Sequence, residues 1–335
     1  NWVRKDYNHP CVIIYSLGNE IEQIGSWRGA DIGLKMAELL RSLDSTRYIT
    51  NGINFLAAAK PLMKTLLKEN HVQKKDDIQE INNAMTQLED VLQWINTNPK
   101  VDEMTAAAID YLDIAGYNYA SERYYKDIVR FPERIIVGTE TSPAALAKNW
   151  EMIKKYPNII GDFCWTAWDY LGEAGIGRMR YRQKENIYGN WPWRVAYCGM
   201  FNLIGDERPL SYWRQIVWGI RKKPYIGVCP PGYTREEKYI SQWCQTDAVC
   251  SWNWPGFEGQ EIYVEVYSNA AEVELFINGQ SCGRKKVDNC SGTIPYWTEF
   301  LTVYEPGIIE ARAYDMKGNT EIFSVTTAKD DNTLK

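Results

Sequence analysis

The sequence predicts an α/β domain over residues 1–222, followed by a linker and an antiparallel β-sandwich over residues 223–335. In the first part, short apolar segments alternate with amphipathic helical segments, a pattern typical of a parallel sheet covered by helices. From residue 261 onward, hydrophobic residues recur at every second position, which is typical of antiparallel strands with one buried face. Pro224, Pro230 and Pro231 mark the change between the two patterns.

Five apolar segments of the first part are predicted to be strands. They cover residues 11–17, 47–51, 111–116, 134–138 and 158–165. The first segment is continuously apolar, which predicts a strand buried on both faces. An eight-stranded α/β barrel needs about 250 residues. Five strand–helix units therefore indicate either an open doubly wound sheet or the rear part of a barrel whose first strands are not present.

Helices are predicted between these strands, the clearest over residues 27–43, 61–95 and 210–220. Ser26 is a suitable N-cap for the first of them. Five of its residues recur at helical spacing, and we expect this apolar stripe to face the core. The stripe consists of Ile32, Met36, Leu39, Leu40 and Leu43.

The last part of the chain is predicted to contain short antiparallel strands. They cover residues 262–266, 273–277, 298–304, 308–314 and 321–327. Asn278-Gly279, between the second and the third, is a strong signal for a tight hairpin turn. Several short strands at this spacing predict a two-layer sandwich.

The composition indicates a globular protein with sizeable cores. The chain has 335 residues, of which 45% are hydrophobic and 24% charged, and its net charge is −5. This acidic balance argues against nucleic acid or an anionic membrane as the main partner. No apolar run approaches the ~20 residues needed to span a bilayer. Because the sequence opens on Asn1 without a visible signal peptide, we expect its natural N-terminus upstream, and both a cytoplasmic and a secreted or periplasmic location stay open.

Residue counts also narrow the chemistry. With only two histidines, His9 and His71, a Ser-His-Asp triad or a multi-histidine zinc site is poorly supported. The eight cysteines form no C-x-x-C pair. No metal and no cofactor are therefore expected. The 14 tryptophans and 22 tyrosines favour a carbohydrate partner, because aromatic faces stack on sugars, although such side chains also fill cores.

Polar and aromatic side chains follow all five predicted strands. In α/β barrels the reacting groups lie just past the carboxyl ends of the strands. Two of the five ends carry a carboxylate directly, and paired carboxylates are what glycoside hydrolysis requires, one as proton donor and one as nucleophile or base. The residues that we select are Asn19 and Glu20, Asn54, Tyr119, Glu140, and Trp165, Trp168 and Asp169.

Segment 8–20, Asn-His-Pro-Cys-Val-Ile-Ile-Tyr-Ser-Leu-Gly-Asn-Glu, resembles the acid/base signature of glycoside hydrolase family 2. Segments 112–119, 136–140 and 163–173 resemble that family's sixth, seventh and eighth barrel strands. The resemblance implies that residues 1–222 are strands four to eight of a TIM barrel. Segments 191–199, 252–256 and 275–279 resemble β-galactosidases of the family that carry an additional immunoglobulin-like domain.

The resemblance also implies roles for the selected residues. Glu20 would be the acid/base and Glu140 the nucleophile of a retaining β-galactosidase. Asn19 would hold the sugar 2-hydroxyl, Tyr119 would contact the nucleophile, and Trp165 would form the floor of the sugar site. The family's N-terminal domains and its barrel strands one to three are not present in this sequence.

Other functions stay open at this stage. A β-glucuronidase or β-mannosidase could use the same scaffold, and so could a carbohydrate-binding relative without catalysis. A non-glycosidase α/β enzyme with an open sheet is a further alternative. The expected partner is a β-galactoside or oligosaccharide, and association into a homo-oligomer stays open.

Overall fold

The structure, a computed structural model, describes residues 2–62, 89–181, 188–233, 240–288 and 294–328. They belong to two compact units, Asn1–Cys164 and Trp165–Lys335. Most of the predicted helix over 61–95 lies outside the described residues, and α6 (Glu89–Thr97) covers its last positions. No described helix combines the length and the apolar character that crossing a membrane would need.

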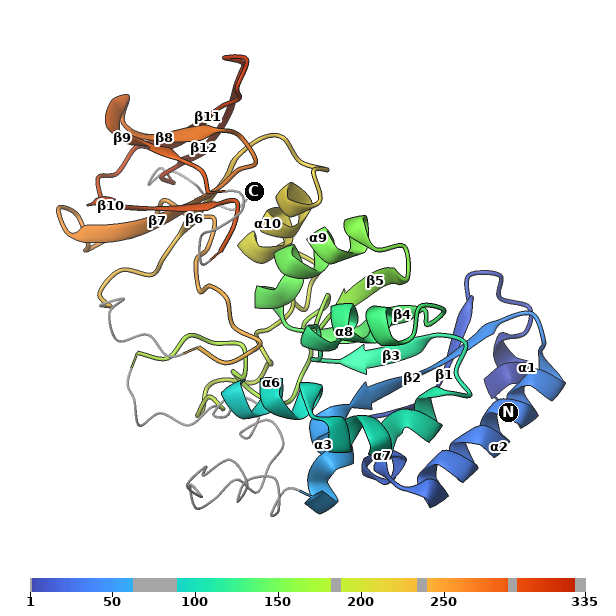
Figure 1. The fold of residues 1–335 in the computed structure, drawn as a ribbon. Coiled ribbons are helices and arrows are strands. Elements are labelled where there is room, and N and C mark those ends of the chain that lie inside the picture. The colour runs from blue at the N-terminus through green and yellow to red at the C-terminus, as the bar shows by residue number, and fades with distance from the viewer. Residues whose placement is uncertain (1, 63–88, 182–187, 234–239, 289–293, 329–335) are drawn as a thin grey trace. The chain divides into compact units, whose positions relative to one another are not determined.

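The first unit contains a five-stranded parallel sheet. Its strands are β1 (Ile14–Asn19), β2 (Tyr48–Asn54), β3 (Ala115–Asn118), β4 (Ile136–Thr141) and β5 (Ile159–Cys164). They lie side by side in the order in which they follow along the chain (Figure 1). A doubly wound sheet would reverse its strand order at a switch point. The uninterrupted order β1 to β5 is instead that of a barrel wall, which confirms the prediction of part of a TIM barrel.

Helices and short 3₁₀ segments connect these strands. They are α1 (Trp2–Asp6), η1 (Glu22–Gly25), α2 (Trp27–Leu43), α3 (Phe55–Ala59), η2 (Lys60–Leu62), α6, α7 (Pro99–Ile109), α8 (Glu122–Arg130), η3 (Pro143–Ala145) and α9 (Leu146–Lys155). The Ser26 hydroxyl accepts a hydrogen bond from the Gly29 amide at the start of α2. Such a cap satisfies one of the otherwise unpaired first amides, so α2 begins where the sequence predicts.

The prediction that the apolar stripe of α2 faces the core is wrong for four of its five residues. Leu40 is 3% exposed and packs with Tyr15 and Leu17 of β1. Leu39, by contrast, is 61% exposed. The buried residues of α2 are Ala30, Ala37 and Leu40, and the two alanines let the helix approach its neighbours closely. The exposed members of the stripe are Ile32, Met36, Leu39 and Leu43.

Strand β1 is also less buried than its apolar sequence predicts. Tyr15 and Leu17 are buried, whereas Ser16 is exposed and Ile13, just before the strand, is 66% exposed. The reason is that β1 forms one edge of the sheet, so only one of its sides has a neighbouring strand among the described residues.

The second unit holds two antiparallel sheets beside helix α10 (Pro209–Val217). Their strands are β6 (Tyr225–Val228), β7 (Glu261–Tyr267), β8 (Glu272–Ile277), β9 (Gln280–Lys286), β10 (Trp297–Val303), β11 (Ile308–Tyr314) and β12 (Thr320–Thr326). One sheet has the order β10-β7-β6 and the other β12-β11-β8-β9. Strands of both sheets share one core around Trp252, Leu275 and Phe300. This division of consecutive strands between two layers is that of an immunoglobulin-like sandwich.

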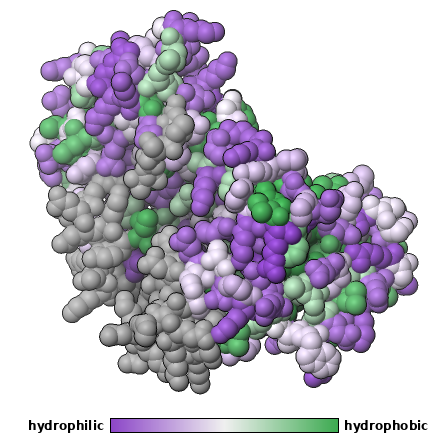
Figure 2. Space-filling model, viewed as in Figure 1, coloured by the Kyte–Doolittle hydropathy of each residue, from purple (hydrophilic) through white to green (hydrophobic). Residues whose placement is uncertain are grey.

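The Asn278-Gly279 turn forms as predicted and joins β8 to β9, although the sequence pattern predicts no strand over Gln280–Lys286. Both residues have positive φ angles, 49° and 82°, which a two-residue hairpin turn of this hand requires. Strand β6 is missed by the sequence pattern, because it has only four residues and lies between prolines. On the face seen in Figure 2, most described residues at the surface are hydrophilic, with hydrophobic ones scattered among them. The domain boundary at residues 222/223 stays a prediction.

Candidate active site

The register of the parallel sheet gathers polar side chains at one edge of the first unit. Asn19 pairs with Gly52, and Asn54 at the end of β2 pairs with Asn118 at the end of β3. Asn118 in turn pairs with Glu140. Because all five strands run in the same direction, these positions lie at the carboxyl edge of the sheet, where barrel enzymes place their reacting groups.

Glu20, the first residue past β1, has a left-handed backbone with φ of 50°. Its amide donates to the carbonyl oxygen of Gly52 at 2.8 Å, which connects it to β2. The Glu20 Oε1 accepts hydrogen bonds from Asn54 Nδ2 at 2.8 Å and from Asn118 Nδ2 at 3.1 Å. The strained turn and the two amide bonds together fix the direction of this carboxyl group.

Asn54 can hold Glu20 because its own orientation is fixed. Its Oδ1 caps helix α3 by accepting from the amides of Leu56 and Ala57 at 3.0 and 3.2 Å. An amide group whose oxygen is occupied in this way presents its nitrogen, a donor, on the other side. The N-cap of a short helix therefore also orients a carboxyl group at the sheet edge.

Glu140 lies in β4, and hydrogen bonds connect its carboxyl group to Tyr119, Asn19 and Asn118. Burial raises the pKa of the Glu140 carboxyl above its ordinary value, and the nearby negative charge of Glu20 raises it further. The hydrogen bonds from the three neighbours act in the opposite direction, because they stabilise the ionised form. Glu140 and Glu20 are thus electrostatic neighbours, although 120 positions separate them in the sequence.

Asn118 neighbours both carboxyl groups, because it pairs with Glu140 in the sheet and hydrogen bonds to Glu20. Its Nδ2 lies 3.1 Å from Glu20 Oε1 and 3.0 Å from Asn19 Oδ1. The hydroxyl of Thr139 donates to its Oδ1 at 2.6 Å and so fixes which end of the amide faces the carboxylates. Asn118 and Thr139 both follow predicted strands, but the sequence did not identify either as a site residue. Their position after a strand was the only indication.

Gly52 leaves the space that these amides occupy. A Cβ atom built at Gly52 would lie 2.4 Å from Asn19 Oδ1 and 3.2 Å from Asn118 Oδ1. Real Cβ atoms do not approach polar atoms so closely, so any larger residue would displace Asn19. Gly52 is therefore part of the site, although it contributes no side chain.

Trp165, Trp168 and Asp169, the other selected residues, belong to the second unit. The indole of Trp165 packs edge-on against the ring of Tyr170 at 5.8 Å. Trp168 is 53% exposed and stacks on Phe201 with ring centroids 5.6 Å apart. Aromatic rings can stack on sugars, and the sugar contacts of all three residues stay predictions.

Asp169 is buried, with 3% of the residue exposed, and both oxygens of its carboxylate have hydrogen-bond partners. It forms an ion pair with Arg208 Nη2 at 2.7 Å and accepts from the Tyr197 amide at 2.9 Å. The Arg208 guanidinium also lies 4.2 Å from the centroid of the Tyr197 ring. These contacts indicate that Asp169 holds the chain segments of the second unit together.

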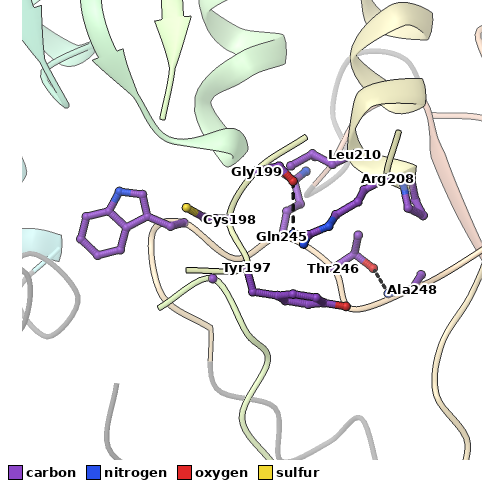
Figure 3. A pocket seen from close by; sticks show the side chains of 11 residues that line it. Tyr197, Cys198, Gly199, Arg208, Leu210, Gln245, Thr246 and Ala248 are labelled. Atoms are coloured by element: carbon purple, nitrogen blue, oxygen red, sulfur yellow. Dashed lines mark hydrogen bonds between the residues drawn. The ribbon is translucent and has the colours of Figure 1, made fainter. Parts of the chain in front are cut away.

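A small cavity lies beside this ion pair, and Figure 3 shows Tyr197, Arg208 and Gln245 among its lining residues. Its volume is about 30 Å³, far below the ~300–1,000 Å³ of small-molecule sites but sufficient for water. Gln245 is 8% exposed, and its amide has no hydrogen-bond partner in the described part of the chain. Water can both donate to and accept from such an amide, whereas a sugar would not fit.

A barrel sheet with two neighbouring carboxyl groups at its carboxyl edge is the arrangement of α/β-barrel glycosidases. Comparison with known protein families agrees, because the TIM-barrel domain of glycosyl hydrolases family 2 matches residues 1–187. The chain belongs to glycosyl hydrolase family 2. A second family, a domain of unknown function named DUF4982, matches residues 259–321 within the sandwich.

Individual relatives agree with this assignment. A putative β-glucuronidase of Formosa agariphila is 25% identical over all of this chain and 29% of its own length. β-Galactosidase BoGH2A of Bacteroides ovatus is 23% identical over 93% of this chain and 36% of its own. The chain thus spans about a third of the length of these curated relatives.

A solved structure also resembles the chain along nearly its whole length. It is a glycosyl hydrolase family 2 member from Bacteroides cellulosilyticus, with 30% sequence identity and a TM-score of 0.73. The match covers 98% of this chain and 36% of that protein.

Proposed function

We propose that this protein is a retaining glycoside hydrolase that cleaves terminal β-D-galactosides, with Glu140 as nucleophile and Glu20 as acid/base. The observation that carries the proposal is the placement of both carboxyl groups beside Asn118, which donates to Glu20 Oε1 at 3.1 Å and pairs with Glu140 in the parallel sheet. Retaining enzymes need carboxyl groups ~5–5.5 Å apart, whereas inverting enzymes separate them by ~6.5–9.5 Å. A shared neighbouring residue favours the shorter separation.

The reaction would proceed in two displacements. The Glu140 carboxylate attacks the anomeric carbon while the Glu20 carboxyl group transfers its proton to the departing oxygen. A glycosyl ester forms on Glu140, and the aglycone leaves as an alcohol. Glu20, now a carboxylate, removes a proton from water as the water attacks the same carbon and releases the sugar. Asn19 would strengthen its bond to the 2-hydroxyl in the transition state.

The surroundings of the carboxyl groups favour a neutral sugar. The groups that hydrogen bond to Glu20 and Glu140 in the described part of the first unit are amides and a tyrosine side chain, without a cation. A glucuronide brings a carboxylate of its own, which proteins usually bind with arginine or lysine. The Formosa relative nevertheless makes β-glucuronidase the second candidate, with β-mannosidase a further alternative on the same scaffold.

A panel of aryl β-glycosides tests the substrate class. In the native protein that carries this chain, we expect the β-galactoside to be hydrolysed with the highest kcat/KM, ahead of the β-glucuronide and the β-mannoside. A preference for the glucuronide would instead establish the second candidate. Binding of galactosides without hydrolysis of any of the three substrates would favour a carbohydrate-binding relative that has lost catalysis.

The variant Glu20→Ala tests the acid/base role. Loss of a positioned general acid typically costs 10²–10⁴-fold, and we expect a loss in this range for substrates with poor leaving groups. Aryl glycosides with very acidic leaving groups need no protonation, so their glycosylation rate should change little. Equal losses for both kinds of substrate would contradict the assignment of Glu20.

A further inference from the structure

Tyr119, whose side chain hydrogen bonds to Glu140, has an unusual backbone. Its φ angle is 52°, in the left-handed region that aromatic residues rarely adopt. Its amide donates to the Glu140 carbonyl oxygen at 2.7 Å. Such a conformation persists only where the surroundings hold it, so the opposite side of this residue, its carbonyl group, needs a partner as well.

Asn96 supplies that partner from helix α6. Its side chain is buried, the residue being 3% exposed, and its Nδ2 donates to the Tyr119 carbonyl oxygen at 3.0 Å. The same nitrogen lies 3.4 Å from Glu122 Oε2, a longer and weaker contact. The chain therefore holds Tyr119 at two points, through Glu140 on one side and Asn96 on the other.

Asn96 is itself held by a buried arginine. Arg123 Nη1 donates to the Asn96 carbonyl oxygen at 2.8 Å and to Asp102 Oδ1 at 2.6 Å. Arg123 is 1% exposed, pairs with Asp127, and lies 4.0 Å from the centroid of the Phe55 ring. A charge that is buried and paired on several sides has little freedom to move, so the Asn96 backbone is a firm support.

We propose that Asn96 is a positioning residue for the reaction, which fixes the left-handed turn at Tyr119 so that the Tyr119 side chain meets Glu140. Within the described part of the chain, the Asn96 side chain hydrogen bonds to the Tyr119 carbonyl oxygen and to Glu122 rather than to Glu20 or Glu140, so it acts through Tyr119. This inference rests on the proposed function, because it assumes that Glu140 reacts.

A double-mutant cycle separates this role from a purely structural one. Asn96→Leu removes the donor and keeps a similar volume, and we expect kcat/KM to fall roughly three- to tenfold, the worth of one hydrogen bond. In a Tyr119→Phe background, which lacks the hydroxyl being positioned, Asn96→Leu should change kcat/KM less than about twofold. Full, multiplicative losses in both backgrounds would overturn the inference.

Asn158→Ala is the matched control. Asn158 Nδ2 also donates to a backbone carbonyl oxygen, that of Pro132, at 2.7 Å, but it precedes β5 at the other edge of the sheet. Its loss should leave kcat/KM unchanged. Should Asn96→Leu not fold, Asn96→Asp removes the donor at unchanged size and should give the same pattern.

A measurement without substrate distinguishes failure of this inference from failure of the proposed function. Hydrogen exchange of the Tyr119 amide should accelerate in Asn96→Leu and remain unchanged in Asn158→Ala. Unchanged exchange in Asn96→Leu would overturn the inference. If exchange accelerates while Glu140→Gln retains normal turnover, Asn96 still holds the turn, but the proposed function and with it the catalytic role of this turn are refuted.

Discussion

The Asn118 amide concentrates much of the site's chemistry in one residue. Its nitrogen faces Glu20 and Asn19, and its oxygen is occupied by the Thr139 hydroxyl. An amide has donors at one end and acceptors at the other, so the Thr139 bond decides that a donor faces the carboxyl groups. Without it the amide could turn and present its oxygen to Glu20, where oxygen would repel carboxylate.

Thr139→Val tests this orientation. Valine has nearly the shape of threonine and removes only the hydroxyl, so we expect kcat/KM to fall roughly three- to tenfold. Thr141→Val is the matched control, because Thr141 lies on the same strand and its hydroxyl donates to Asp162 at 2.8 Å. Its kcat/KM should stay at the wild-type level. An equal loss in both variants would show that the strand, and not the Asn118 amide, is affected.

The pH dependence follows from the raised pKa of Glu140. A nucleophile must be ionised, so kcat/KM should fall as the pH decreases through this pKa, at a higher pH than for an ordinary glutamate. The Tyr119 hydrogen bond lowers this pKa. Tyr119→Phe should therefore raise it and move the acidic limb of the profile to higher pH.

The profile of kcat/KM against pH checks this shift. Tyr125→Phe serves as control, because Tyr125 is 57% exposed on α8 and has no part in the proposed site. Its acidic limb should coincide with that of the wild type. A limb that stays in place or moves to lower pH in Tyr119→Phe would contradict the hydrogen bond between Tyr119 and Glu140.

At the scale of helices and strands, the sequence correctly predicts features that depend on neighbouring residues. It does not predict features that depend on tertiary contacts. The Ser26 cap and the spacing of α2 are properties of neighbouring residues, and the sequence predicts this helix from Trp27 to Leu43 as observed. Strand β3 was predicted over residues 111–116 and runs instead from Ala115 to Asn118. Its extent is decided by pairing with β2 and β4, which are distant in the sequence. The residues of β3 themselves therefore do not indicate where the strand begins and ends.

The same contrast applies to the site. Glu20, Asn19, Tyr119 and Glu140 could be selected because each follows or ends an apolar segment, and the structure brings them together with Asn54. Asn96 could not be selected, since it lies within a helix and only the fold carries it to the Tyr119 carbonyl. Residues that act through another residue have no motif of their own.

Two adjacent leucines of α2 test the orientation of this helix. Leu40→Ala should cost about 2–5 kcal/mol of the free energy of unfolding, because Leu40 is 3% exposed in the core. Leu39→Ala should change it by less than about 0.5 kcal/mol, because Leu39 is 61% exposed. Urea unfolding of both variants checks this. Similar losses of unfolding free energy in both variants would instead support the buried apolar stripe that the sequence predicts.

At the scale of the whole molecule, the chain combines a barrel wall with an immunoglobulin-like sandwich, and it spans about a third of the length of its curated relatives. In the described part of the chain, β1 has a neighbouring strand on one side only, and four residues of the apolar stripe predicted on α2 are exposed. The candidate site nevertheless has its two carboxyl groups and their amide partners within the first unit alone. Both carboxyl groups of the proposed mechanism therefore belong to the described part of residues 1–164.

Covalent trapping tests the central claim, that Glu140 is the nucleophile of a retaining glycosidase, most directly. An activated 2-deoxy-2-fluoro-β-galactoside should form a glycosyl ester that hydrolyses slowly, because the fluorine destabilises both transition states. Peptide mass mapping of the native protein after this treatment should find the added sugar on Glu140, and Glu140→Gln should acquire none. A sugar attached to another residue, or turnover of galactosides without any trapped ester, would contradict the account.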